Sequence, residues 1–198
     1  MPRWEPDARA RLEAAALDLY DARGFDQTTV EDIAERAGLT KRTFFRHFAD
    51  KREVLFASGG NLEDLVVNAV RTAPKSLGPL DAVGLGLMAM ADRFDEQGEI
   101  VARRFRIVRA SPELWERQLI KFAAMAESVA RALRARGVSE TAAILAAESG
   151  ITALRIASDR WIRNPGKRSP RQLIGEVLAE LRAVAARARP ARVNRTVP

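Results

Sequence analysis

The segment TVEDIAERAGLTKRTFFRHFADK, residues 29–51, constrains the fold more than any other part of this 198-residue chain. Its first helix has an apolar face that consists of Ile33, Ala34 and Ala37. Gly38 ends this helix, and Thr40 is placed to cap a second short helix that begins at Lys41. Two short helices joined by a tight turn predict a helix-turn-helix unit.

The second helix of this unit has two opposite faces. On a wheel of about 100° per residue, an arc of roughly 140° holds Lys41, Arg42, Phe45 and Arg46. Phe44 lies on the other side, as expected of a core residue. A solvated face does not need a large apolar ring, so Phe45 among cations predicts contact with a DNA base. The alternative is an ordinary amphipathic helix whose basic face is only solvated.

The rest of the chain predicts further helices and no strand, so the expected class is all-α. Gly24 ends a first helix that starts near Asp7, and Thr28-Thr29-Val30-Glu31 has a capping-box pattern. Asp50 and Glu53 form another capping box, which predicts a long fourth helix. More helices are expected near residues 80–94, 99–110, 112–136, 139–163 and 170–188.

The composition argues against several classes of protein. The chain has no cysteine and one histidine, His47, which excludes disulfides and leaves few ways to build a metal site or a catalytic triad. We therefore expect no metal, no cofactor and no enzymatic activity. No apolar run is long enough to span a membrane, and the N-terminus lacks the apolar core of a signal peptide. A soluble, cytoplasmic protein is expected.

The net charge of +7 is unevenly distributed. Residues 163–198 hold nine Arg or Lys and two Glu, so the excess lies at the C-terminal end. The positive charge of the helix-turn-helix is local, between Gly38 and Arg52, and a focused patch of this kind can meet phosphates.

Residues 8–56 resemble the DNA-binding domain of TetR-type bacterial transcription regulators, in the order helix, GF, TT, IAERAGL, TKRTFFRHF, DK, VL. The resemblance implies an all-helical homodimer with an N-terminal helix-turn-helix three-helix domain. It also implies a C-terminal helical domain that dimerises and binds a small effector. The sequence departs from the family at Phe45, where tyrosine is usual.

Carried over by position, the resemblance implies a palindromic double-stranded operator and a set of contacts to it. Lys41, Arg42 and Phe45 would reach base edges, while Lys51 would hold a phosphate at the start of the fourth helix. The predicted DNA-binding set is Thr28, Thr29, Thr40, Lys41, Arg42, Thr43, Phe45, Arg46, His47 and Lys51.

Three parts of the chain are expected: residues 1–51 for DNA binding, 52–189 for ligand binding and dimerisation, and 190–198 as a basic, disordered tail. Gly84 and Gly86 interrupt an apolar helix, which indicates either room for a ligand or close helix packing. The predicted pocket residues, which could equally be plain core, are Met88, Phe94, Phe105, Trp115, Leu119, Phe122 and Met125. A basic run either pairs with an acidic effector or forms a solvated face, and consists of Arg103, Arg104, Arg106 and Arg109.

The last two helices carry apolar stripes and a short connection, which predicts an antiparallel pair. The resemblance implies that this pair meets a two-fold copy and forms a four-helix dimer bundle. The predicted interface residues are Ile151, Leu154, Trp161, Ile174, Val177, Leu178 and Leu181. Packing within one chain alone is the alternative.

These features predict a homodimeric repressor that a small-molecule effector releases from its operator. An activator or a ligand-independent regulator would have the same sequence pattern. A helical adaptor whose basic patch binds an acidic protein is an alternative from a different class.

Overall fold

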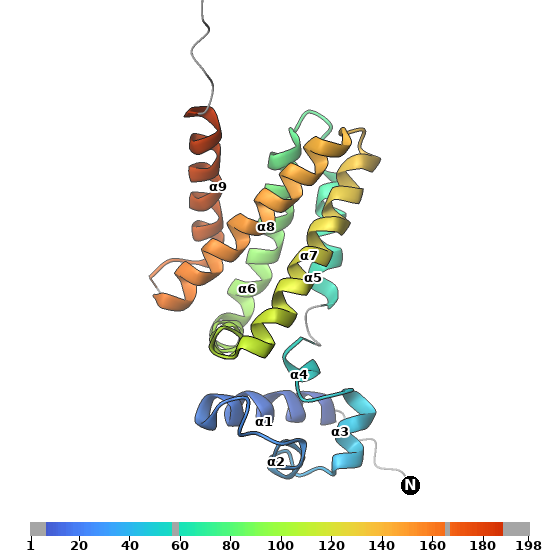
Figure 1. The fold of residues 1–198 in the computed structure, drawn as a ribbon, viewed down its shortest axis with the longest axis vertical. Coiled ribbons are helices and arrows are strands. Elements are labelled where there is room, and N and C mark those ends of the chain that lie inside the picture. The colour runs from blue at the N-terminus through green and yellow to red at the C-terminus, as the bar shows by residue number, and fades with distance from the viewer. Residues whose placement is uncertain (1–6, 57–59, 165–166, 188–198) are drawn as a thin grey trace, which may run out of the picture.

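The computed structural model describes residues 7–56, 60–164 and 167–187, and every regular element in these ranges is an α-helix (Figure 1). The predicted all-α class is confirmed. The expected tail, residues 190–198, lies outside the described residues. In chain order the helices are α1 (Ala8–Arg23), α2 (Val30–Arg36), α3 (Lys41–His47), α4 (Glu53–Phe56), α5 (Gly60–Thr72), α6 (Pro79–Ala110), α7 (Pro112–Ala135), α8 (Glu140–Arg163) and α9 (Pro170–Arg187).

Local signals account for most of the helix ends. Gly24 follows α1 with a φ of 85°, and Gly38 follows α2 with a φ of 65°, a left-handed conformation that favours glycine. Pro112 and Pro170 begin α7 and α9, as proline at the first helical position does. The side chain of Ser111 accepts a hydrogen bond from the Leu114 N–H and so caps α7.

Three details refine the sequence-based expectation. The helices expected at residues 80–94 and 99–110 are the two parts of α6, which meet at a kink where Gly98 takes the non-helical angles φ 21° and ψ −98°. The long fourth helix was expected where α4, of four residues, and α5 lie, and residues 57–59 between them are outside the described ranges. The capping box of α2 lies one residue later than expected, because Thr29 caps the helix and Asp32 completes the box.

The buried side chains form two clusters. The N-terminal cluster joins α1–α4 and includes Leu12, Ile33, Phe44 and Leu55. The C-terminal cluster joins α5–α9 and includes Leu87, Leu133, Ile174 and Leu178. Figure 1 shows α1–α3 as a layer at one end of the molecule, with α5–α8 as a bundle beside it and α9 against α8. The domain boundary at residue 51 stays a prediction.

Helix α6 contributes to both clusters. Leu87 and Met90 are buried in the C-terminal cluster, whereas Ile107 and Val108, after the bend, are buried in the N-terminal cluster. The two ends of the molecule are therefore joined by α6, whose two parts meet at Gly98.

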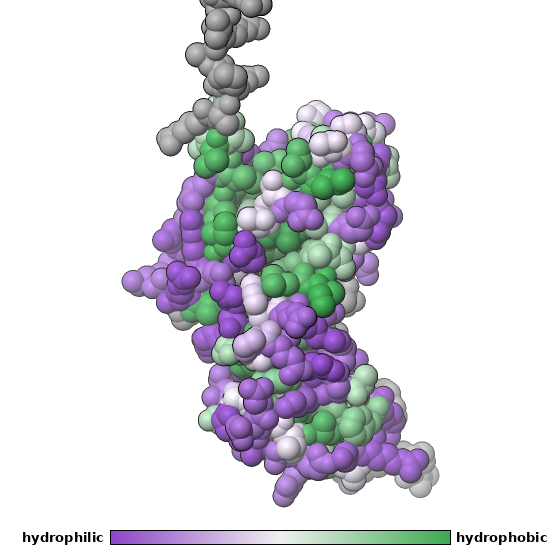
Figure 2. All heavy atoms as spheres, viewed as in Figure 1, coloured by the Kyte–Doolittle hydropathy of each residue, from purple (hydrophilic) through white to green (hydrophobic). Residues whose placement is uncertain are grey.

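The outer faces of α8 and α9 retain apolar side chains, and Figure 2 shows hydrophobic atoms gathered over these helices. The large hydrophobic residues exposed there are Ile144, Leu145, Ile156 and Val184. Within the described ranges, no helix has the length and apolar character that crossing a membrane requires.

Close packing explains one of the two glycines within α6, Gly86. A Cβ atom added at Gly86 would lie 2.9 Å from both the Cγ1 atom and the carbonyl oxygen of Val66 on α5. At Gly84 the nearest atom is Cδ1 of Leu178, at 3.4 Å, which is an ordinary contact. Gly86 thus allows α5 and α6 to approach each other, and neither glycine opens space for a ligand.

We expect the substitutions Gly86→Ala and Gly84→Ala to change stability in opposite directions. Gly86→Ala forces α5 away from α6 and should destabilise the protein by about 1–3 kcal/mol. Gly84→Ala adds helix propensity without a clash and should stabilise it by up to about 1 kcal/mol. Urea unfolding of both variants measures the difference, and equal effects would contradict the close packing of α5 and α6.

Candidate functional site

The exposed face of α3 is the first candidate site. Phe44 is fully buried and packs against Phe48, whereas the adjacent Phe45 is 50% exposed. Lys41, Arg42 and Arg46 are exposed as well. The predicted division of this helix into a core face and a cationic face is confirmed, while contact between these residues and DNA stays a prediction.

Contacts from α1 and from the turn hold α3 in place. The hydroxyl of Thr40 caps the helix by accepting a hydrogen bond of 3.1 Å from the Thr43 N–H. Arg11 of α1 donates to the carbonyl oxygen of Ala37, directly before the turn at Gly38. Sequence reasoning missed Arg11, because this contact joins residues 26 positions apart. The helix is therefore fixed at its N-terminus and through its buried face.

Two of the predicted DNA-binding residues, Thr28 and Lys51, have other partners. Thr28 is fully buried, and its hydroxyl donates a 2.8 Å hydrogen bond to the carbonyl of Gly24, so it does not face solvent. The ammonium of Lys51 donates to the carbonyls of Phe25 and Thr28 at 2.9 and 3.0 Å, and it lies 4.2 Å from the Phe25 ring centroid. Lys51 thus holds the loop before α2 instead of extending into solvent.

The backbone of Lys51 is also tied to α1. The Tyr20 hydroxyl donates a 2.6 Å hydrogen bond to the carbonyl oxygen of Lys51, and burial raises the pKa of this phenol. Tyr20 therefore remains a neutral donor, and Lys51 connects α1 with the loop between α1 and α2.

The other predicted DNA contacts remain at the surface. The Thr29 hydroxyl is occupied with Asp32, and the Thr43 hydroxyl lies 3.0 Å from that of Thr40. Lys41 forms an ion pair with Glu31, the residue that the shifted capping box leaves available. Because exposed ion pairs of this kind contribute little, Lys41 can exchange the carboxylate for a phosphate or a base.

A cavity of about 600 Å³ is the second candidate site. Four of the predicted pocket residues line it: Phe94, Phe105, Phe122 and Met125. Its remaining lining comes from α4–α8, and consists of Leu55, Phe56, Leu62, Glu63, Leu65, Met90, Arg93, Val101, Arg104, Val108, Gln118, Lys121 and Leu154. The volume lies within the range of small-molecule sites.

Three predicted pocket residues lie elsewhere. Met88 points toward Gly175 of α9, with its Cε atom 3.4 Å from the position of an added Cβ. Trp115 packs between the two clusters and lies under the guanidinium of Arg109 at 4.0 Å. Leu119 is 43% exposed. Trp115 and Leu119 lie on one face of α7, as their regular spacing predicted, but only part of that face turns to the cavity.

The basic run of α6 divides into separate contacts. Arg103 donates to Asp18 at 2.9 Å and to Asp21 at 2.5 Å, both on α1, and its hydrogen bond lowers the pKa of Asp18. Arg104 lines the cavity, whereas Arg106 pairs with Glu99, and Arg109 with Asp159. The run is therefore neither one solvated face nor one anion site.

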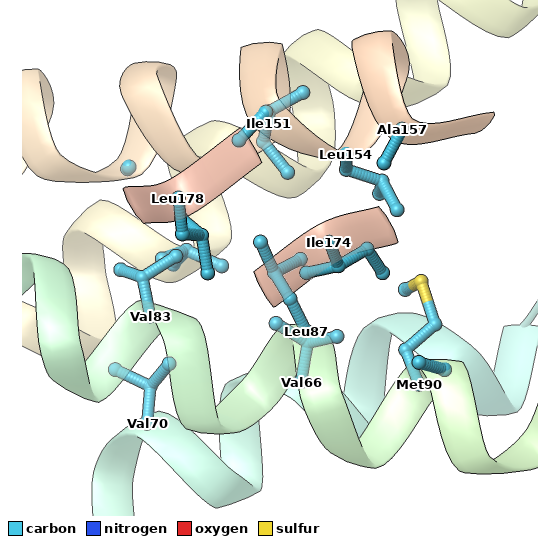
Figure 3. Close-up of a cluster of buried hydrophobic side chains, with 14 of the residues drawn as sticks. Val66, Val70, Val83, Leu87, Met90, Ile151, Leu154, Ala157, Ile174 and Leu178 are labelled. Atoms are coloured by element: carbon cyan, nitrogen blue, oxygen red, sulfur yellow. The ribbon is translucent and has the colours of Figure 1, made fainter. Parts of the chain in front are cut away.

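The predicted dimer residues require a correction. Six of the seven are at most 6% exposed within a single chain, namely Ile151, Leu154, Trp161, Ile174, Val177 and Leu178. Figure 3 shows Ile151 and Leu154 of α8 and Ile174 and Leu178 of α9 in one cluster with Val83 and Leu87 of α6. Leu181 is partly exposed. The strongest apolar stripes of α8 and α9 thus pack inside the protomer, and the exposed residues on their outer faces remain for a partner.

The sequence of the chain is similar to those of known transcriptional regulators. Residues 12–57 match the family model for bacterial regulatory proteins of the tetR family. The chain is 32% identical to the HTH-type transcriptional regulator TcmR of Streptomyces glaucescens over 134 residues, which cover 65% of this chain. That alignment spans 59% of TcmR.

Two solved structures have a similar fold. One is SmeT, the repressor of the Stenotrophomonas maltophilia multidrug efflux pump SmeDEF, with a TM-score of 0.62 and 21% identity, over 90% of this chain and 92% of SmeT. The other is FadR of Thermus thermophilus, a TetR-family repressor in complex with lauroyl-CoA, with a TM-score of 0.56 and 20% identity. It is matched over 87% of this chain and 92% of FadR. The helix-turn-helix geometry and the family match together identify residues 12–57 as a helix-turn-helix domain of the tetR family of bacterial regulatory proteins.

Proposed function

We propose that this chain is a cytoplasmic, homodimeric repressor that binds a palindromic operator through α3 and releases it when a small molecule occupies the cavity. The observation that carries DNA reading is Phe45, a half-exposed ring surrounded by exposed cations. An apolar ring can contact a thymine methyl group, while Lys41 and Arg42 can meet guanine acceptors or phosphates.

An effector is supported by the position of the cavity. Its wall includes Leu55 and Phe56 of α4, which are part of the N-terminal cluster, together with residues of the C-terminal bundle. A ligand there would contact both the DNA-binding end and the rest of the molecule. FadR of Thermus thermophilus, which has a similar fold, binds lauroyl-CoA. An effector that prefers one arrangement of the two ends would shift the population toward it.

Dimerisation is assigned to the outer faces of α8 and α9. These faces expose Leu145 and Ile156 of α8 and Val184 of α9, the last at 68% exposure. Apolar side chains of this size gain free energy when a second copy covers them. A two-fold dimer would present two α3 helices to the two halves of a palindrome. An activator would have the same geometry, and a reporter assay distinguishes it from a repressor.

We expect the neighbouring substitutions Phe45→Ala and Phe44→Ala to act on different properties. Phe45→Ala should leave the melting temperature nearly unchanged but weaken binding to a selected duplex by about 1 kcal/mol, since half of the ring remains to be covered. Phe44→Ala should destabilise the fold by about 3–5 kcal/mol, because a buried ring is removed.

Duplexes selected by the protein from a random library serve for the titrations, beside thermal melts of both variants. If Phe45→Ala lowers the melting temperature as much as Phe44→Ala does, Phe45 is a core residue and the proposed reading face is wrong. DNA binding that is insensitive to Lys41→Ala and Arg42→Ala would favour the adaptor alternative.

The dimer surface is tested by placing a charge on it. Val184→Glu should yield monomers in analytical ultracentrifugation, because the carboxylate would be buried without a partner. Ile120→Glu on α7, where the native side chain is 64% exposed, is the matched control and should remain dimeric. A dimer that survives Val184→Glu but not Ile120→Glu would move the interface to α7.

A further inference from the structure

The cavity has charged side chains within a mostly apolar lining. Aromatic and aliphatic side chains form most of the lining, yet three cations, Arg93, Arg104 and Lys121, line it together with a single carboxylate, Glu63. Lys121 also lies over the Phe56 ring, 5.5 Å from the centroid. The charge balance of the cavity is thus positive.

Arg104 is a largely buried cation of the cavity whose hydrogen-bond donors are not all paired within the described ranges. Its side chain is only 18% exposed, and its Nε atom is buried without a hydrogen-bond partner among the described residues. The ion pair that it forms, with Oε2 of Glu13 on α1, spans 4.0 Å. Burial lowers the pKa of Arg104. A guanidinium offers five N–H donors, and a buried charge is costly unless it is closely paired.

Glu13 is a shared partner in this contact. Its other oxygen accepts a 3.2 Å hydrogen bond from Arg9. An anion that enters the cavity could approach Arg104 more closely than Glu13 does, and Glu13 would keep a partner at the surface. The exchange therefore leaves no carboxylate buried alone.

We propose that Arg104 binds the anionic head group of an amphipathic effector, in place of Glu13, while the apolar chain of the effector lies among Phe94, Phe105 and Phe122. The inference rests on the proposed function and names the class of its effector, a chain carboxylate or a similar acid. The aromatic lining suits an apolar chain, and Arg104 can bind a carboxylate through two parallel N–H donors.

The exchange would act on the DNA-binding end. Glu13 belongs to α1, the helix from which Arg11 holds the turn before α3. Arg103, the neighbour of Arg104, ties α6 to the same helix through Asp18 and Asp21. An anion on Arg104 would replace the contact between Arg104 and Glu13. The contacts of Arg103 with α1 would remain.

Isothermal titration calorimetry of the full chain with sodium dodecanoate tests the proposal, and 1-dodecanol serves as the neutral probe. Arg104→Met should weaken dodecanoate binding by roughly tenfold to a hundredfold, the range for a lost hydrogen bond to a charged group, and leave dodecanol binding unchanged. Arg104→Lys should recover part of the loss. Arg106→Met is the matched control, because Arg106 pairs with Glu99 outside the cavity, and should bind as the wild type does.

Glu13→Gln should tighten dodecanoate binding, since the competing carboxylate is gone. The proposal fails if the wild type does not bind dodecanoate, if Arg104→Met binds it unchanged, or if Glu13→Gln has no effect. Because no DNA is present in this titration, its failure is distinct from a failure of operator binding. Thermal melts of each variant verify folding.

Discussion

The rest of the molecule depends on helix α6 being buried at both of its ends. Leu87 and Met90 are covered by the C-terminal bundle, and Ile107 and Val108 are covered by α1–α4 and α7. Removing α1–α4 would return Ile107 and Val108 to water, at a cost of about 1.5–3 kcal/mol for each one. Gly98 lets the helix bend between the two packing surfaces. The two parts of the helix thus pack against different surfaces, as the proposed coupling between the cavity and the DNA-binding end requires.

The DNA-binding end shows how burial and exposure divide neighbouring residues. Phe44 and Phe45 are chemically identical, yet one is fully buried and the other is half exposed. The hydrophobic effect favours covering both rings, but the helix points them to different sides, so Phe45 can be covered only by another molecule. The capped N-terminus of α3 and the contact from Arg11 keep this ring in a fixed position. Rigid placement of this kind limits the entropy lost on binding.

Local patterns predicted α3, its cap and the class of fold, because helix periodicity and capping depend on residues three or four positions apart. They did not predict whether an apolar stripe packs within its own chain or against a second copy. Ile174 and Leu178 pack inside the protomer, whereas a dimer contact was expected. The partners of Lys51 lie 23 and 26 residues away, so helix position alone could not reveal them. The cavity was predicted in part, since Phe94 and Phe122 line it, whereas Arg104 was one of four arginines that the sequence could not separate.

The central claim is that the cavity and the DNA-binding face are coupled through α6, and reciprocal titration tests it most directly. The affinity for a selected duplex is measured with and without saturating sodium dodecanoate, and the affinity for dodecanoate with and without saturating duplex. The account predicts that each ligand weakens the other by the same factor, as thermodynamic linkage requires. If dodecanoate binds in the cavity and both affinities stay unchanged, the two sites are independent and the account is contradicted.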